Sequence, residues 1–330
     1  MTMGIEYSIF DGKCLDTCGI KLLSQWQYTP REYLRFFDQL PSIDYWIDEI
    51  NTVIRSDDSF LIQAKDSNGS LLAFLVFQYL PWESKLYSKT MGTFSHVVFD
   101  KDTSSIEGAL VGLFRKAIVI AETKQYGFIS VKTPTQDMPA IHALEQLGFL
   151  LVDINQYYVV NIEDSNSYVV NDGILIEQAE EDDLDAAMEM FESSFADHFG
   201  RFNSDTVLKD SNVNFYKEWA RSSFLGYADL IIAAKIDGNI AGLSIWKNAS
   251  EMEIKHNLPL AHYSIGAVAA NHFGKGIFQR VTLAGMKVMQ ERGFQFIEGP
   301  THINNYPVQR GYQKLNWINT GAKASFHLWI

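Results

Sequence analysis

The chain is poor in cysteine, in proline and in basic residues. Its 330 residues include 2 cysteines and 8 prolines, and 27 Lys and Arg stand against 40 Asp and Glu, a formal charge of -13. The cysteines, Cys14 and Cys18, are too few for a disulfide framework, and a zinc site would need two more ligands, while the nearest histidine is His96. The acidic balance argues against nucleic acid as a partner, because phosphate backbones attract clustered Lys and Arg.

Long hydrophobic runs are also missing. The longest, residues 71–82, is too short to span a bilayer, and residues 1–13 lack the basic flank and apolar core of a secretion signal. We therefore expect a cytoplasmic protein without a membrane partner, either a monomer or a homodimer. With 47% apolar residues the chain can bury a sizeable core, and its length favours two domains over one.

The two halves of the chain resemble each other at an offset of about 166 to 170 residues. Residues 60–69 and residues 230–239 each read as an apolar strand followed by a turn and the start of a second strand. Further on, Leu-Gly-Phe at residues 147–149 corresponds to Leu-Asn-Trp at residues 315–317. A repeat on this scale indicates two copies of one domain.

The copies are predicted at residues 1–165 and residues 172–330. The join falls in residues 161–173, which are rich in polar turn formers. The order of patterns predicts the mixed α/β (α+β) class, with each copy a mixed twisted sheet flanked by helices on both faces.

The segment from residue 262 to residue 317 carries the pattern that points to chemistry. An apolar strand over residues 262–270 runs into a turn with Gly274, Lys275 and Gly276, and a helix is predicted over residues 277–292. Glycine lets a backbone approach an anion closely, and the first amides of a helix have no intrahelical partner. The turn therefore predicts a pyrophosphate site.

Two other nucleotide-binding patterns fit this turn less well. A Walker loop needs Ser or Thr after its lysine, and Gly276 follows Lys275. A Rossmann fingerprint needs a third small residue where this chain has Gln279, although Glu298 would suit the role of its acidic ribose ligand.

Beyond the turn come a strand over residues 294–303, a short helix over residues 305–314 and a closing strand that ends at residue 330. This order, together with Asn271-x-x-Gly274-x-Gly276, Asn305, Tyr312 and Lys314-Leu315, resembles the GNAT superfamily of N-acetyltransferases. The resemblance implies two tandem GNAT-like domains. It also implies direct transfer of an acetyl group from acetyl-CoA, a co-substrate, to a small-molecule amine.

The resemblance assigns roles to particular residues. A main-chain amide of the splayed central strand, that of Ala267 or Val268, would bind the thioester carbonyl, and Tyr312 would protonate the sulfur. Asn305 would bind the pantetheine arm or act as a helix N-cap, and Tyr312 has the alternative role of packing its ring in an amphipathic helix. The cofactor-binding turn comprises Phe273, Gly274, Lys275, Gly276, Ile277 and Phe278.

The base that deprotonates the amine stays open. His302, Glu298 and His262 lie on or beside the two strands expected to splay around the thioester, and a water molecule is an equal alternative. His327 in the final strand matches a position that the family often fills with histidine, and its alternation with Phe326 and Leu328 also suits a sheet residue.

The acceptor side is predicted from residues 195–223, which resemble amino-sugar nucleotide acetyltransferases such as TDP-fucosamine acetyltransferase. Arg201 and Arg221 would pair with a diphosphate, and Tyr216 or Trp219 would stack on a base or sugar. Core packing of these aromatic residues is the alternative.

The first copy lacks the cofactor pattern. Residues 101–108 contain no Gly-x-Gly turn and bring two acids to the place of the pyrophosphate, and the short helix over residues 139–147 has no tyrosine. We therefore expect only the second copy to bind acetyl-CoA, with the first as a degenerate copy that shapes the acceptor pocket. Two alternatives remain: an aminoacyl or peptide-amine transferase of paired domains, and a CoA-binding module without turnover.

Overall fold

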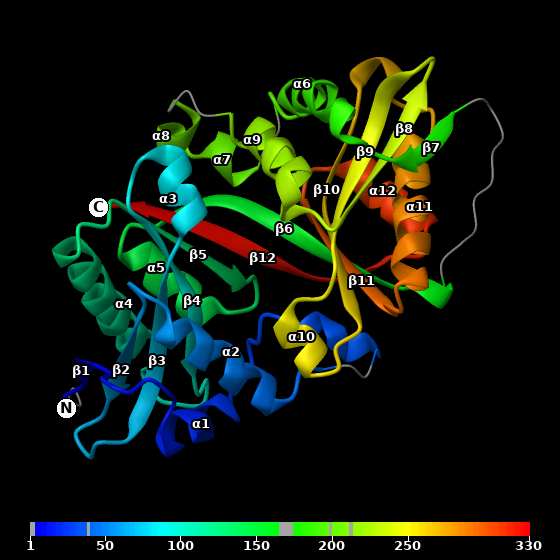
Figure 1. Cartoon of the computed structure of the whole chain (residues 1–330). Coiled ribbons are helices and arrows are strands. Elements are labelled where there is room, and N and C mark those ends of the chain that lie inside the picture. The colour runs from blue at the N-terminus through cyan, green and yellow to red at the C-terminus, as the bar shows by residue number, and fades with distance from the viewer. Residues whose placement is uncertain (1–3, 38–39, 165–173, 198–199, 211–213) are drawn as a thin grey trace. The chain divides into compact units, whose positions relative to one another are not determined.

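The computed structural model of the chain describes residues 4–37, 40–164, 174–197, 200–210 and 214–330 (Figure 1). The chain folds into two compact units. Unit 1 comprises Met1–Glu32, Leu40–Ile154 and Ala322–Ile330, and unit 2 comprises Tyr33–Gln39 and Asn155–Gly321. Residues 165–173, most of the predicted join, lie outside the described residues. Within the described ranges, no helix combines the length and apolarity needed to cross a membrane.

Unit 1 is built on a sheet with helices on both faces. Its strands are β1 (Glu6–Ile9), β2 (Phe60–Lys65), β3 (Leu71–Tyr79), β4 (Met91–Phe99), β5 (Phe128–Pro134) and most of β12 (Ile318–Trp329). Its helices are α1 (Thr17–Leu23), α2 (Ile43–Arg55), α3 (Pro81–Tyr87), α4 (Ile106–Thr123) and α5 (Met138–Gln146). The strand order is β1-β2-β3-β4-β5-β12. Among these described strands β4 and β5 pair in parallel, and the other neighbours pair antiparallel.

Unit 2 repeats this plan. Its strands are β7 (Leu175–Gln178), β8 (Leu230–Ile236), β9 (Asn239–Lys247), β10 (Leu260–Val268), β11 (Phe296–His302) and most of β6 (Leu150–Asn161). Its α-helices are α6 (Leu184–Ser194), α7 (Arg201–Ser204), α8 (Thr206–Lys209), α9 (Phe215–Ser222), α10 (Glu251–Lys255), α11 (Ile277–Glu291) and α12 (Tyr306–Lys314). Short 3-10 or π-helical turns are Glu32–Phe37, Ile162–Asp164, Glu181–Asp183, Ser223–Tyr227 and Ala270–His272. The strand order is β7-β8-β9-β10-β11-β6.

Each unit takes its sixth strand from the other half of the sequence. Residues 323–329 of β12, near the C-terminus, pair with β5 of unit 1, whereas residues 155–161 of β6 pair with β11 of unit 2. The two long strands therefore each run from one unit into the other. Sequence likeness separates the halves at residues 161–173, and the pairing of these two strands crosses that division.

Helices cover both faces of the unit 2 sheet, as Figure 1 shows for α11 and α12 near the viewer's right. The α11 and α12 face buries alternating strand residues such as Ile232, Trp246, Tyr263 and Ile297. The opposite face packs against α6 and carries Leu260 and Phe296, which contact Leu34 from the N-terminal half of the chain. The alternation follows from the two-residue period of strands, which sends neighbouring side chains to opposite faces.

The observed elements match the predicted order closely. The helix predicted over residues 277–292 is α11, and the helix and strand that follow it are α12 and β12. The central strand begins two residues earlier than predicted and ends at Val268, because Ala270–His272 form a 3-10 turn. The predicted fold class, mixed α/β with two similar sheet-and-helix units, is confirmed.

Candidate active site

The parallel strands of unit 2 separate after a short paired stretch. β10 and β11 pair at three positions, the last being His262 with Glu298. Beyond that pair β10 stays on β9, while β11 stays on β6, as their registers show. A register shift between Tyr263 and Ile265 marks the point where β10 begins to diverge. The main chain of both strands beyond this point faces a gap in the hydrogen-bonded ladder, which a ligand's polar groups can enter.

One face of the separation point carries three charged or polar side chains in contact. His262 Nδ1 lies 2.7 Å from Glu298 Oε1, and His262 Nε2 lies 3.1 Å from Glu253 Oε2. The structure thus brings together two of the predicted base candidates, His262 and Glu298. It adds Glu253 of α10, which the sequence analysis missed, since nothing in the spacing of residues 253, 262 and 298 shows that Glu253 reaches His262.

The opposite face of the separation point holds Tyr312. The side chain is fully buried, its ring stacks on Trp317 with centroids 4.4 Å apart, and its hydroxyl oxygen would lie 2.7 Å from a Cβ at Gly299 of β11. Within the part of the chain that the structure describes, this hydroxyl has no hydrogen-bond partner. A buried hydroxyl without a partner is unfavourable, so a ligand group at Gly299 would stabilise it.

Burial also controls the protonation of Tyr312. Removal from water, and secondarily the neighbouring Tyr263 and Tyr158, raise the pKa of its hydroxyl well above the usual range. Burial likewise raises the pKa of Tyr263, whose hydroxyl faces Thr282 of α11. Tyr312 therefore keeps its proton at neutral pH, the state that a proton donor to a thiolate requires.

The glycine turn between β10 and α11 has the conformation expected of an anion site. Gly274 and Gly276 adopt positive φ angles of 78° and 73°, which the absence of a Cβ permits at little cost. The amides of Gly276, Ile277 and Phe278 donate to no acceptor in the described ranges. They begin a helix of 15 residues, so the dipole of α11 adds to their attraction for an anion.

Side chains around the turn differ in exposure. Phe273 is exposed, whereas Ile277 is buried and Phe278 packs against Gly311 and the Tyr312 ring. The Lys275 ammonium lies in the open and contacts His272 Nδ1 at 3.0 Å. Lys275 is therefore placed to approach a bound phosphate, while the aromatic ring of Phe278 belongs to the core.

Two polar groups lie beside the gap between the strands. Ala269 donates its amide to Ala241 of β9, and because strand residues alternate, the Val268 amide points away from β9 and the Ala267 amide points toward it. Of these two candidates, Val268 therefore has the orientation needed to reach a ligand. Asn305 occupies the N-cap of α12, yet its carboxamide makes no capping bond.

The two remaining histidine candidates differ in place. His302 ends β11 and is buried, and its Nδ1 accepts a hydrogen bond from the Asn304 amide, which puts the proton of a neutral ring on Nε2. His327 lies in unit 1, on the part of β12 that pairs with β5, and its ring meets Phe128 edge-on. His327 therefore is not part of the unit 2 cluster.

The predicted acceptor residues lie on α7 and α9. Tyr216 is buried and its ring stacks on Phe195, with centroids 4.3 Å apart, so it serves helix packing. Trp219 is half-buried against Phe215, and Arg221 is exposed near Glu218. The Arg201 guanidinium lies over the Phe202 ring. The Phe202 ring in turn stacks on Phe215, with centroids 3.4 Å apart.

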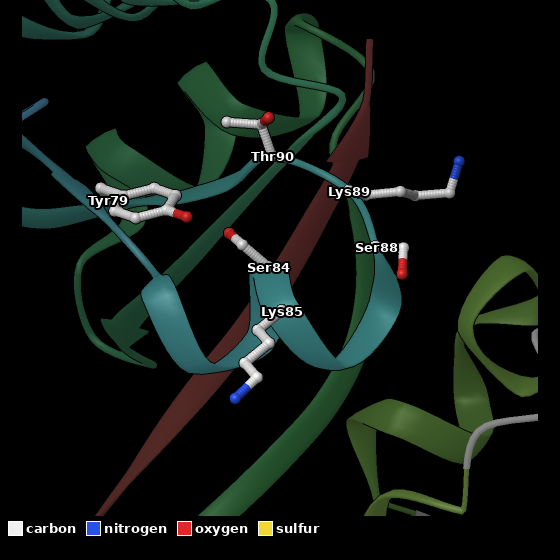
Figure 2. Close-up of a pocket in the computed structure, with 6 residues that line it drawn as sticks. All are labelled: Tyr79, Ser84, Lys85, Ser88, Lys89 and Thr90. Carbon is white, nitrogen blue, oxygen red and sulfur yellow. The ribbon is translucent and has the colours of Figure 1, made fainter.

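A separate pocket opens on unit 1, with a volume of about 250 Å³ (Figure 2). It is lined by Tyr79, Ser84, Lys85, Ser88, Lys89 and Thr90. Figure 2 shows the Lys85 and Lys89 side chains extending away from the Ser84 hydroxyl. None of the predicted site residues lines it, so the candidate active site is placed by the strand separation and not by this pocket. Among the described side chains, no group of three or more His, Cys, Asp or Glu is arranged for a metal ion.

Comparison with known proteins agrees with this architecture. No protein-family model matches the chain. The spore coat polysaccharide biosynthesis protein SpsD of Bacillus subtilis (strain 168) is 21% identical over 268 residues, which are 79% of this chain and 86% of that protein.

Solved structures cover the whole chain. One is a GCN5-related glucosamine N-acetyltransferase region of a fungal multidomain β-N-acetylglucosaminidase. It aligns with a TM-score of 0.60 at 12% identity, over 99% of this chain and 38% of that one. This chain therefore spans under half of that protein. A tandem GNAT protein from the clavulanic acid biosynthesis pathway aligns with a TM-score of 0.55 at 11% identity, over 99% of this chain and 98% of that one. The fold is therefore that of GCN5-related N-acetyltransferases, in tandem form.

Proposed function

We propose that unit 2 is an N-acetyltransferase that moves the acetyl group of acetyl-CoA to a primary amine by direct attack. The observation that carries this proposal is the pair of groups at the strand separation. A carboxylate, Glu298, lies on one face, and a protonated, partnerless hydroxyl, Tyr312, is buried on the other. A base and an acid on opposite sides of one gap are what acyl transfer to an amine needs.

The residues around the gap suit acetyl-CoA. The amides of residues 276–278 and the Lys275 ammonium would hold the pyrophosphate, and Asn305 would bind the pantetheine arm with its uncommitted carboxamide. The Val268 amide would donate to the thioester carbonyl oxygen and stabilise the negative charge that develops there. Acetyl-CoA itself supplies the activated acyl group.

The reaction is balanced by two proton movements. Glu298 removes the proton that converts the ammonium to the attacking amine, with His302 or a water molecule as alternatives. The amine nitrogen then bonds to the carbonyl carbon, the carbon–sulfur bond breaks, and Tyr312 gives its proton to the leaving thiolate. The nitrogen loses a second proton, which restores Tyr312 through solvent, so the products are an amide, CoA thiol and one released proton.

The acceptor that we propose is an amino-sugar nucleotide. SpsD is named for spore coat polysaccharide biosynthesis, and the fungal region is named a glucosamine N-acetyltransferase. Both names point to sugar chemistry. On the α7 and α9 side, Arg201 and Arg221 are the cations proposed to pair with the diphosphate, and Trp219, half-buried, is the ring left to stack on a sugar or base, since Tyr216 stacks on Phe195.

We further propose that unit 1 does not bind acetyl-CoA. Residues 100–105 join β4 to α4, and Asp100 and Asp102 in this turn would repel a pyrophosphate. The protein then has one cofactor site per chain.

Titration calorimetry and transfer assays test the proposal together. We expect acetyl-CoA to bind with a stoichiometry of one. We expect the protein to acetylate TDP-fucosamine faster than free glucosamine or a peptide with an N-terminal amine. Binding without any transfer would indicate a CoA-binding module, and transfer to the peptide alone would indicate the peptide-amine transferase. No heat on titration, together with no rise in melting temperature, would refute the enzymatic proposal.

A further inference from the structure

The contact of one imidazole with two carboxylates on unit 2 is a feature that acetyl transfer alone does not require. His262 has Glu298 at Nδ1, 2.7 Å away, and Glu253 at Nε2, 3.1 Å away. A neutral imidazole has a single N–H and can donate at one nitrogen only. Two hydrogen bonds to carboxylate oxygens therefore need one more proton within the group of His262, Glu253 and Glu298.

Glu253 is held where it is by its own helix. The side chain is 1% exposed, and its Oε2 accepts a hydrogen bond of 2.6 Å from the Ser250 amide, while the Ser250 hydroxyl accepts one from the Glu253 amide. This reciprocal pair is a capping box, which fixes the first turn of α10. The carboxylate that faces His262 therefore has little freedom to turn away.

The other charged groups near His262 are engaged or face away. Lys247, the cross-strand neighbour of His262 on β9, forms an ion pair with Asp229 at 2.9 Å. On α10, Glu251 and Lys255 are exposed, and Leu34 is the buried residue of the segment that packs on Leu260 and Phe296. Glu253 and Glu298 are the two carboxylates in hydrogen-bond contact with the ring.

We infer that His262 and Glu253 are positioning residues, which hold the Glu298 carboxylate in place for proton removal from the amine. The inference rests on the proposed function. Glu253 holds Nε2 of the His262 ring, and Nδ1 of the ring holds Glu298 Oε1 through a hydrogen bond of 2.7 Å. Without the Glu253 carboxylate, the ring loses the contact that fixes its orientation toward Glu298.

The hydrogen bonds of the ring can be read without any substrate. In nitrogen-15 spectra, assigned with His262→Gln, we expect both ring nitrogens of His262 to show a hydrogen bond in the intact protein. In Glu253→Gln the signal of Nε2 should change. Gln still accepts from the Ser250 amide, so the helix cap is kept. Glu251→Gln, an exposed change on the same helix, is the matched control and should leave the spectrum as it is.

The effect on turnover is read with acetyl-CoA and TDP-fucosamine. Glu253→Gln should lower kcat about tenfold, as expected for one charge-assisted hydrogen bond. The Kd of acetyl-CoA should not change. His262→Gln should lower kcat by a similar factor, and the double variant should match His262→Gln alone, since both residues act through one link.

Two results would overturn the inference: a His262 ring spectrum that is the same in Glu253→Gln as in the intact protein, or a kcat of Glu253→Gln that equals that of Glu251→Gln. If the intact protein binds acetyl-CoA but acetylates none of the amines, the proposed function fails and the positioning role fails with it, while the spectra still report the hydrogen bonds of the ring. The two failures are therefore told apart.

Discussion

In unit 1 the parallel strands β4 and β5 separate beyond Phe94 and Val131, and in unit 2 β10 and β11 separate beyond His262 and Glu298. The strand registers and the helices that follow show that these two separation points correspond, at an offset of about 168 residues. Thr93, Phe94, Ser130, Val131, Leu144 and Phe149 of unit 1 stand where unit 2 has His262, Tyr263, Glu298, Gly299, Tyr312 and Trp317, respectively. Unit 1 keeps the strand path and replaces the chemistry with apolar and small polar groups.

The first residues of the short helices show the same contrast. Asp137 caps α5 in unit 1: its carboxylate accepts from the Ala140 amide and from the Thr133 hydroxyl, and it is buried. Asn305 holds the equivalent position on α12 and caps nothing with its side chain. The cap in unit 1 serves the stability of the helix, whereas in unit 2 the carboxamide is left for another partner.

The turns before the long helices share one backbone feature. Ser105 precedes α4 with a φ of 66°, and Gly276 precedes α11 with a φ of 73°. The left-handed residue is thus a property of the fold, and the missing Cβ and the second glycine, Gly274, belong to unit 2 alone. The comparison teaches that the architecture survives without the site, so the groups peculiar to unit 2 are the ones to test.

The largest effect is expected from Tyr312→Phe. Loss of the hydroxyl should lower kcat at least about tenfold, since general acids commonly contribute about 10²-fold to 10⁴-fold, and leave the acetyl-CoA affinity nearly unchanged. Tyr158→Phe is the control, because its ring lies 5.1 Å from Tyr312 while its hydroxyl contacts Gln156. Steady-state kinetics and calorimetry decide: an equal loss of turnover and affinity in Tyr312→Phe would make the ring structural.

Asp137→Asn tests the unit 1 cap. Burial raises the pKa of this carboxyl from 3.8 to about 6. The folded protein therefore binds a proton that the unfolded chain releases between these values, and stability falls as pH rises from about 4 to about 6, by up to about 3 kcal/mol. Asn keeps both contacts without the charge, so the variant should lose this part of the pH dependence and melt higher at pH 7.5. Identical denaturation curves of both proteins at pH 4.5 and pH 7.5 would contradict it.

Gly276→Asp brings the acidity of the unit 1 turn into unit 2. A carboxylate beside the amides of α11 should weaken acetyl-CoA on the order of tenfold or more, through repulsion at short range. Gly276→Ser, the residue found before α4, shares the backbone strain of about 1 kcal/mol without the charge and should bind acetyl-CoA within a few-fold of the unaltered protein. Calorimetry of the two variants side by side gives the answer, and equal weakening would exclude a charge effect.

The smallest effect is expected from Asn305→Ala. If the carboxamide binds the pantetheine arm, the variant should bind acetyl-CoA about fivefold more weakly, the contribution of one neutral hydrogen bond. Its melting temperature should hardly move, because no capping bond is lost. Asp137→Ala should do the reverse, losing about 1 kcal/mol of stability with unchanged affinity. A fall in melting temperature for Asn305→Ala would show that the residue serves the helix after all.

Local patterns predicted much of this fold. The glycine turn, the helix after it and the repeat between the halves all follow from short-range rules: periodicity, the need for positive φ, and turn formers. The roles of Tyr312 and Asn305 were predicted from the resemblance to the GNAT superfamily and stay predictions. The charged neighbour Glu253 was missed. Tyr216 was predicted to stack on a sugar or base, and in the structure its ring stacks on Phe195. Both outcomes depend on which helices pack together, which the sequence pattern does not show.

The sequence by itself determined the elements, their order and the glycine turn, since each depends on residues close together along the chain. Only the tertiary structure decided that β12 completes the sheet of unit 1 and β6 that of unit 2, that His327 belongs to unit 1, and that His262 lies between Glu253 and Glu298. Strand partners and charged contacts join residues far apart in sequence, and their energies depend on burial and direction, which no local pattern encodes.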